Sequence, residues 1–195
     1  MKYFVIYVPG LGDKRVYAGF QKAAVGLWRT SGVQPYYFLV HWANASETYD
    51  QKLQRLLKTI DTAHAKGYTV SLVAASAGAS LILTALSKRK DKIHRAVAIC
   101  GKLRNAGTVS EALFALNPAF KDSLQAYSRI EPTLTATDRK KILIARAARD
   151  VYVPAADGEV EGAATYVIPS MGHVVSVFMA LTFFRRAILR FVKAQ

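Results

Sequence analysis

The sequence predicts an α/β protein, built as a three-layer α/β/α sandwich around a mainly parallel sheet of about six strands. Two observations predict this fold. Short apolar runs rich in β-branched and aromatic residues alternate with longer segments that have helical periodicity. Most of the short runs are continuously apolar, which is typical of strands covered by helices on both faces.

Strand and helix candidates alternate along the chain. We expect strands at 2–8, 36–41, 69–75, 93–100, 141–148 and 163–168. We expect helices at 14–31, 47–66, 77–90 and 173–193. Because crossovers between parallel strands are right-handed and carry helices, this order places helices on both faces of the sheet. The second helix is expected to begin after Ser46 and to end at Gly67.

The length of 195 residues suits one buried core. No repeat, low-complexity tract or Gly/Ser linker divides the sequence, so we expect a single domain over 1–195. The long span 102–140 between two predicted strands has short helical patterns on either side of Asn117-Pro118. It is the expected position of a small helical, cap-like insertion.

The composition excludes several classes of protein. Hydrophobic residues make up 52% of the chain and charged residues 21%, which excludes a disordered chain. The single cysteine, Cys100, excludes an internal disulfide and a thiolate metal cluster, and suits a reducing compartment. No apolar stretch reaches the length of roughly 18 residues that a membrane-spanning helix needs. We therefore expect a cytoplasmic protein.

The net charge of +14 is the one unusual bulk property. General solubility is the first interpretation, because net charge bears on association and not on fold. No recognisable nucleic-acid-binding motif is present, so we expect no nucleic-acid partner. The last predicted helix combines apolar residues with Arg185, Arg186, Arg190 and Lys193, which leaves contact with an anionic membrane surface as the lesser alternative. The sequence leaves the oligomeric state open.

In an open parallel sheet, ligands bind beyond the carboxyl ends of the strands. The segments that follow the predicted strands are Pro9–Gly12, His41–Trp42, Ser76, Cys100–Lys102, Arg149–Asp150 and Pro169–His173. A serine, an aspartate and a histidine are therefore expected at one edge of the sheet. These are the residue types that acyl transfer by a serine nucleophile requires.

The segment Ala74–Gly78 joins a predicted strand directly to a predicted helix and has the form small-x-Ser-x-Gly. A strained turn of this kind lifts the Ser76 hydroxyl above the sheet, and it needs small residues on both sides. It also aims the amide of Ala77, at the start of the helix, toward a developing oxyanion.

These motifs resemble the α/β-hydrolase fold, in particular its small lidless members, over nearly the whole chain. The strand-end acid of that family resembles Asp150, within Arg149–Pro154, and its late histidine resembles His173, after Pro169–Gly172. The order serine, acid, histidine is the one this fold uses. The family's oxyanion loop resembles Pro9–Gly12, which implies that the Leu11 amide is the second oxyanion donor. The first antiparallel strand pair of the family is missing.

The resemblance implies a serine hydrolase that cleaves an ester, or less often a thioester or amide, through an acyl-Ser76 intermediate. His173 would act as the general base and Asp150 would orient it. A small-molecule acyl compound would be the substrate, and neither a metal nor an organic cofactor is needed. The expected pocket residues are Gly10, Gly12, His41, Trp42 and Lys102. A weak preference for anionic substrates is suggested by Lys102, Arg104 and Arg149 near the mouth of the site.

Alternative interpretations remain open for each residue. Ser76 could simply cap a helix, and Asp150 could form a turn. His41 is a competing base, and Asp157 and Glu159 are alternative acids. Cys100 is expected to pack behind the serine. The whole chain could also be a catalytically silent binding protein on the same scaffold, or a hydrolase that works at an anionic membrane surface.

Overall fold

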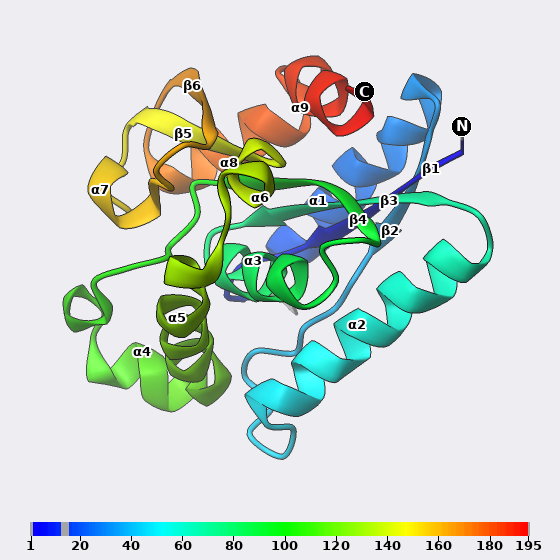
Figure 1. Cartoon of the computed structure of the whole chain (residues 1–195). Helices are drawn as coiled ribbons and strands as arrows, with labels where there is room; N and C mark the ends of the chain where they lie inside the picture. The colour runs from blue at the N-terminus through cyan, green and yellow to red at the C-terminus, as the bar shows by residue number, and fades with distance from the viewer. Residues whose placement is uncertain (1, 13–15, 195) are drawn as a thin grey trace.

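The computed structural model of the chain describes residues 2–12 and 16–194 (Figure 1). Its sheet has six strands in the order β2-β1-β3-β4-β5-β6, and every neighbouring pair is parallel. The strands are β1 (Tyr3–Val8), β2 (Val33–Tyr37), β3 (Thr69–Ala75), β4 (Ile93–Ile99), β5 (Ile142–Arg149) and β6 (Ala164–Met171). The predicted parallel α/β fold is confirmed.

Helices cover both faces of the sheet (Figure 1). One layer contains α1 (Val16–Gly26), the 3-10 helix η1 (Leu27–Ser31), α8 (His173–Leu181) and α9 (Arg185–Lys193). The other layer contains α2 (Tyr49–Ala65), α3 (Gly78–Lys88), α4 (Glu111–Leu116) and α5 (Pro118–Ile130). Alternate residues of each strand pack against the two helical layers, because successive side chains of a strand point to opposite faces of the sheet. In β1, for example, Val5 and Tyr7 pack in the smaller core, under the layer with α1 and α8, and Ile6 and Val8 pack in the larger core, under the layer with α2 and α3.

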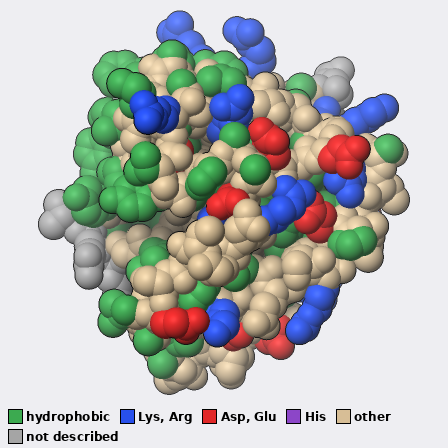
Figure 2. All heavy atoms as spheres, turned by 90° about the vertical axis from the view of Figure 1, so that its left-hand side faces the viewer, with side chains coloured by type: hydrophobic (Ala, Val, Ile, Leu, Met, Phe, Trp, Pro, Cys, Tyr) green, Lys and Arg blue, Asp and Glu red, His purple; other side chains and the backbone are tan. Residues whose placement is uncertain are grey.

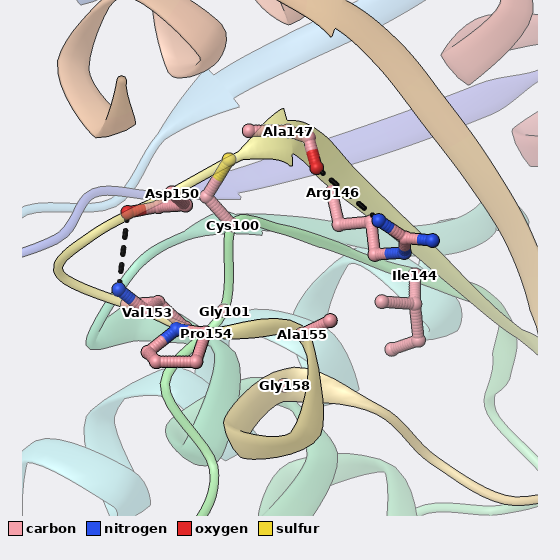
Figure 3. Close-up of a pocket in the computed structure, with 10 residues that line it drawn as sticks. All are labelled: Cys100, Gly101, Ile144, Arg146, Ala147, Asp150, Val153, Pro154, Ala155 and Gly158. Carbon is pink, nitrogen blue, oxygen red and sulfur yellow. Dashed lines mark hydrogen bonds between the residues drawn. The ribbon is translucent and has the colours of Figure 1, made fainter. Parts of the chain in front are cut away.

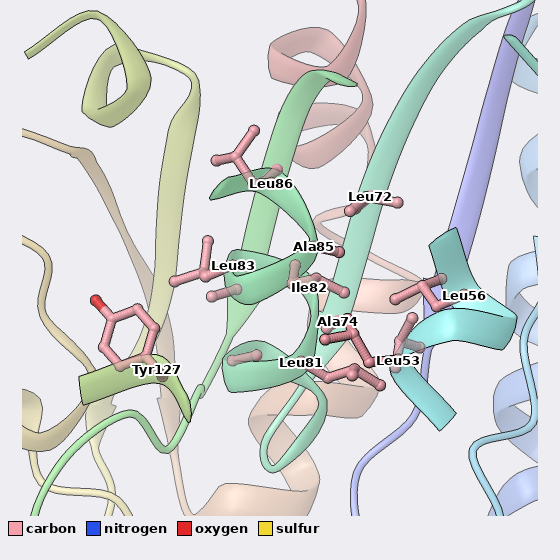
Figure 4. Packing of buried hydrophobic residues seen from close by; sticks show 14 of the residues in the cluster. Leu53, Leu56, Leu72, Ala74, Leu81, Ile82, Leu83, Ala85, Leu86 and Tyr127 are labelled. Carbon is pink, nitrogen blue, oxygen red and sulfur yellow. The ribbon is translucent and has the colours of Figure 1, made fainter. Parts of the chain in front are cut away.

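Helix α3 lies at the centre of the larger core, where its residues Gly78 to Leu86 are all buried. Figure 4 shows Leu81, Ile82 and Leu86 of this helix among side chains from β3, α2 and α5. A helix that is apolar on all sides is stable only when it is surrounded by other elements. The elements around α3 therefore fix the position of the turn that precedes it.

Most of the predicted insertion at 102–140 completes this helical layer. Besides α4 and α5 it contains short turns of helix, namely η2 (Ala106–Thr108), η3 (Glu131–Thr133) and α6 (Ala136–Lys140). Helix α5 packs on α3, and the buried hydroxyls of Ser123 and Ser80 are hydrogen bonded at 2.9 Å. The single-domain organisation over 1–195 and the role of this segment as a cap stay predictions.

The strand predicted at 36–41 is shifted, because β2 is Val33–Tyr37. Residues Phe38 and Val40 are buried, but they belong to the loop that follows the strand and pack into the larger core. Their apolar character reflects this loop packing and not a place in the sheet. Helix α2 also begins later than predicted, because Thr48 forms a capping box with Gln51.

The helix predicted at 173–193 is two helices, α8 and α9, separated at Thr182–Phe184. The buried indole of Trp28 donates a hydrogen bond of 3.0 Å to the carbonyl of Leu181. In an uninterrupted helix this carbonyl would instead accept a hydrogen bond from the backbone amide four residues later. The helix predicted at 14–31 is likewise divided into α1 and η1, and positions 14 and 15 lie outside the described residues.

Among the described residues, each helix is too short or too polar to cross a lipid bilayer.

Trp28→Phe is expected to lower the free energy of unfolding by about 1–3 kcal/mol, because the Leu181 carbonyl loses its buried donor. Urea denaturation followed by circular dichroism measures this change. Leu27→Ala is the matched control, since Leu27 is 54% exposed in the same 3-10 helix. A Trp28→Phe variant as stable as this control would show that the indole hydrogen bond contributes nothing.

Candidate functional site

Ser76 occupies the turn between β3 and α3 and has a positive φ of 51°. Its amide donates to the carbonyl of Ile99 in the neighbouring strand β4 at 2.9 Å. Its carbonyl accepts from the amides of Ala79 at 3.0 Å and Lys102 at 3.2 Å. A non-glycine residue with positive φ is strained, so these backbone bonds hold a conformation that the residue alone would not favour.

Two glycines make room for this turn. A Cβ on Gly10 would lie 2.8 Å from the Cβ of Ser76, and a Cβ on Gly78 would lie 2.7 Å from the carbonyl oxygen of Val8. Both distances are too short for any side chain. The loop after β1 therefore passes directly against the serine, and the position of Gly10 beside Ser76 depends on the missing side chain.

Asp150 and His173 form a hydrogen-bonded pair, with 2.8 Å between Asp150 Oδ2 and His173 Nδ1. The side chain of Asp150 is only 4% exposed. Its other oxygen, Oδ1, accepts from the amide of Tyr152 at 2.9 Å and from that of Val153 at 3.0 Å, and Figure 3 shows the second of these bonds. Since an ionised carboxylate only accepts, Nδ1 carries a proton and Nε2 is the ring atom left to act as a base.

The loops that carry this pair are joined to each other. Strands β5 and β6 pair in the register Arg149↔Met171. Just beyond it, the amide of Gly172 donates to the carbonyl of Arg149 at 2.9 Å. Gly172 has a φ of +94°, a conformation that favours glycine, and His173 starts α8 immediately after it.

Cys100 is close to the Asp150–His173 pair and follows the strand next to the one that Ser76 follows. Cys100 follows β4 as Ser76 follows β3, and these neighbouring strands pair Ala75 with Ile99. The Sγ atom of Cys100, a carboxylate oxygen of Asp150 and a ring nitrogen of His173, the atoms that could bind a metal ion, lie within 4.8 Å of one another. The structure thus brings all four residues to the carboxyl edge of the sheet. No hydrogen bond joins Ser76 to His173 within the described part of the chain.

Burial, together with the nearby Asp150 carboxylate, raises the pKa of the Cys100 thiol to about 12. A neutral thiol is neither a good nucleophile nor a good metal ligand. Asp150 and His173 already share a hydrogen bond, so the donor set Cys100, Asp150 and His173 suits proton transfer better than metal binding.

The expected oxyanion donors lie on either side of Ser76. Ala77 is the N-cap residue of α3, and Leu11 lies in the glycine loop after β1. In the described turns, loops and helix caps, neither of these two amides donates to a backbone carbonyl. The amide of Ala77, at the start of a helix, carries partial positive charge, which suits it to bind an anion.

The residues expected to line the pocket have different positions. Gly10 lies against Ser76, while Gly12 and His41 are half-buried with positive φ values. Trp42 is completely buried, and its indole donates to the Pro9 carbonyl at 3.2 Å. Trp42 therefore supports the glycine loop from beneath instead of contacting substrate.

Lys102 also supports the site instead of lining it. Its side chain is 4% exposed, pairs with the equally buried Asp157 and donates to Thr108 at 2.7 Å. Asp157 accepts a further hydrogen bond from Asn105, so it is engaged away from His173. Arg104 is paired with Glu131. Two of the three cations that suggested a preference for anionic substrates are thus neutralised, and only Arg149 is exposed without a described partner.

The cavity drawn in Figure 3 lies behind Asp150, between the ends of β4 and β5 and the turn α7 (Ala155–Gly158). It has room for about one water molecule. None of the five predicted pocket residues lines it. It is therefore too small to be a substrate pocket.

Comparison with protein families and with curated proteins finds no match to this sequence. Solved structures do match. One, from a pair of metagenome-derived lipolytic enzymes called LipS and LipT, is 15% identical with a TM-score of 0.73, and the alignment covers 100% of this chain and 94% of that chain. A second, an α/β-hydrolase enzyme from the metagenome of lagoon sediments at Mar Chica, Morocco, is 16% identical with a TM-score of 0.71, covering 99% and 91%.

A third similar structure is the monoacylglycerol lipase of Paleococcus ferrophilus, which is 16% identical with a TM-score of 0.66 and coverage of 97% and 93%. The chain has the α/β-hydrolase fold. At this identity the likeness concerns the fold and not the substrate. The sequence did not predict the buried Lys102–Asp157 ion pair of this α/β-hydrolase fold. Lys102 was expected to line the pocket, and Asp157 was an alternative acid.

Lys102→Met is expected to lower the free energy of unfolding by about 3–5 kcal/mol, because it leaves the Asp157 carboxylate buried without its cation. The double variant Lys102→Met/Asp157→Asn is expected to recover part of this loss. Urea unfolding of both variants measures the difference. A double variant less stable than Lys102→Met would contradict the pairing.

Cys100 is expected to react very slowly with a thiol reagent at pH 8 in the folded protein. The shift of its pKa from 9.0 to about 12 lowers the thiolate fraction by about a thousandfold. Labelling with a chromogenic disulfide in buffer and in urea compares the folded and unfolded rates. Fast labelling of the folded protein would show that the thiol is exposed and ionised.

Proposed function

We propose that this protein is a serine hydrolase that cleaves the ester bond of a small-molecule acyl substrate through an acyl-Ser76 intermediate. The observation that carries the proposal is the Asp150–His173 hydrogen bond of 2.8 Å, at the sheet edge where Ser76 occupies its strained turn. The lipolytic enzymes and the monoacylglycerol lipase with similar structures support ester chemistry on this fold.

In the proposed reaction, His173 Nε2 takes the proton of the Ser76 hydroxyl as its oxygen attacks the acyl carbon. The alkoxide leaving group then takes that proton from His173, and water hydrolyses the acyl-serine by the same steps. Asp150 keeps the proton on Nδ1 and stabilises the imidazolium. The amides of Ala77 and Leu11 bind the oxyanion, where each such donor typically contributes about 3 kcal/mol to the transition state.

The contact between Ser76 Oγ and His173 Nε2 forms, in this proposal, when substrate binds. Catalytic hydrogen bonds are often long in unliganded enzymes and tighten in the Michaelis complex. The unbonded state of these two side chains also favours the second candidate function, a binding protein on the hydrolase scaffold without turnover.

A fluorophosphonate probe distinguishes the two candidates. Mass spectrometry of the intact protein should show one covalent adduct on the wild type and none on Ser76→Ala or His173→Ala. Ser128→Ala, at an exposed serine of α5, is the matched control and should label like the wild type. A folded wild type that stays unlabelled would favour the binding protein and overturn the proposed hydrolase.

Asp150→Asn is expected to lower kcat for p-nitrophenyl esters by about 10³–10⁴-fold, because an amide no longer fixes the tautomer of His173. A series of esters of increasing chain length also defines the acyl preference. Glu159→Gln serves as control for the alternative acids, because Glu159 is exposed and its removal breaks no described ion pair. If Glu159→Gln rather than Asp150→Asn abolished turnover, the assignment of the acid would be wrong.

A further inference from the structure

Exposed apolar side chains gather around the loops that carry Asp150 and His173. Each is between 47% and 75% exposed. We call this group the apolar rim, and it consists of Tyr17, Phe20, Val151, Tyr152, Met171, Val174, Val175 and Phe183. In Figure 2, green side chains are concentrated at the left of the face shown.

Ring contacts and helix α8 link several members of the rim. Its end nearest the site is Tyr152, whose ring lies 6.1 Å from that of His173. From His173 the helix α8 carries Val174, Val175 and the half-buried Phe178. The ring of Phe178 lies 4.6 Å from that of Phe20 in α1 and 6.1 Å from that of Phe183.

Core packing does not account for these residues, because the smaller core lies on the other side of the same helices. In α8 that core takes Val177, Ala180 and Leu181, while Val174 and Val175 face outward. Single exposed apolar side chains are ordinary on protein surfaces, but contiguous groups mark places where something binds.

The charge of this helical layer indicates what binds. The helices α1, η1, α8 and α9 contain no aspartate or glutamate, and their charged residues are Lys22, Arg29, Arg185, Arg186, Arg190 and Lys193. The opposite layer differs, since α2, α4 and α5 all contain acidic residues, among them Asp50, Glu111 and Asp122. This helical layer therefore carries basic charge without acidic charge; within it, Lys193 donates to the Ser31 carbonyl, which lies just before the start of β2.

We propose that the apolar rim docks this protein on the surface of an anionic lipid membrane, with the outer face of α1 and α8 and the adjoining loops of Asp150 and His173 facing the lipid. The aromatic and aliphatic rim residues would enter the boundary between headgroups and acyl chains. The acid-free helices beside them would be attracted by anionic headgroups. A neutral apolar partner would not need this charge, and a second copy of the same basic layer would repel it.

Docking in this orientation has a consequence that rests on the proposed hydrolase function. Val151 and Tyr152 follow Asp150, and Met171 and Val174 flank the Gly172-His173 pair, so these four rim residues lie beside two of the candidate catalytic groups. The ester would then be one carried by the membrane. Binding itself requires no turnover, so it can be tested independently.

Cosedimentation with lipid vesicles at physiological salt tests the docking. The full chain should sediment with vesicles of phosphatidylcholine and phosphatidylglycerol, and much less with phosphatidylcholine alone. Phe183→Ser and Arg186→Glu are each expected to weaken binding at least about fivefold. Ser76→Ala should bind like the wild type, so a failure of the proposed chemistry would leave this result intact.

Matched controls come from the opposite layer. Leu116→Ser removes an apolar residue that is 66% exposed in α4, against 73% for Phe183, and Lys58→Glu reverses an exposed charge in α2. Both controls should bind like the wild type, and circular dichroism checks that every variant is folded. Equal effects of rim and control variants, or no binding to anionic vesicles, would overturn the proposal. Sedimentation equilibrium tests whether a second copy of the chain covers the rim instead. If the wild type were a dimer that did not bind vesicles, and Phe183→Ser dissociated this dimer, the proposal would also be overturned.

Discussion

The left-handed backbone of Ser76 is the constraint on which the arrangement of the site depends. Such a conformation costs a residue with a side chain on the order of 1–2 kcal/mol, so the surrounding structure has to supply the difference. It does so through the bonds from Ser76 to Ile99 and Lys102, and through the buried helix α3 that begins directly after the turn. The glycine loop after β1 can approach this turn because Gly10 has no side chain.

The buried pair Lys102–Asp157 extends this support to the next strands. The carbonyl of Asp157 accepts from the amides of Leu103 at 2.9 Å and Arg104 at 3.0 Å, so the loop after β4 is tied to the turn after β5. Lys102 thereby takes part twice, since its backbone amide also bonds to Ser76. A residue that looks like a substrate-binding cation in the sequence instead joins the serine turn to the segment that follows Asp150.

The sequence predicts those parts of the fold that depend on local pattern. Strand β3 was predicted with its observed bounds because its residues are buried on both faces of the sheet. The meeting of Asp150 with His173 also follows from strand order, since both residues come after neighbouring parallel strands. Contacts between distant residues escape such reasoning. The break before α9 depends on Trp28, which is 153 residues from Leu181, and the pairing of Lys102 depends on a residue 55 positions away.

The position of each strand within the sheet gives the candidate groups unequal freedom. Ser76 follows β3, which has hydrogen-bonded neighbours on both sides, whereas His173 follows β6, an edge strand paired only with β5. Displacing the nucleophile would disturb three strands and the buried helix behind them. Displacing the imidazole would disturb one ladder and the start of α8. More of the structure therefore holds the serine in place than holds the histidine, and the serine acts as the fixed point of the site.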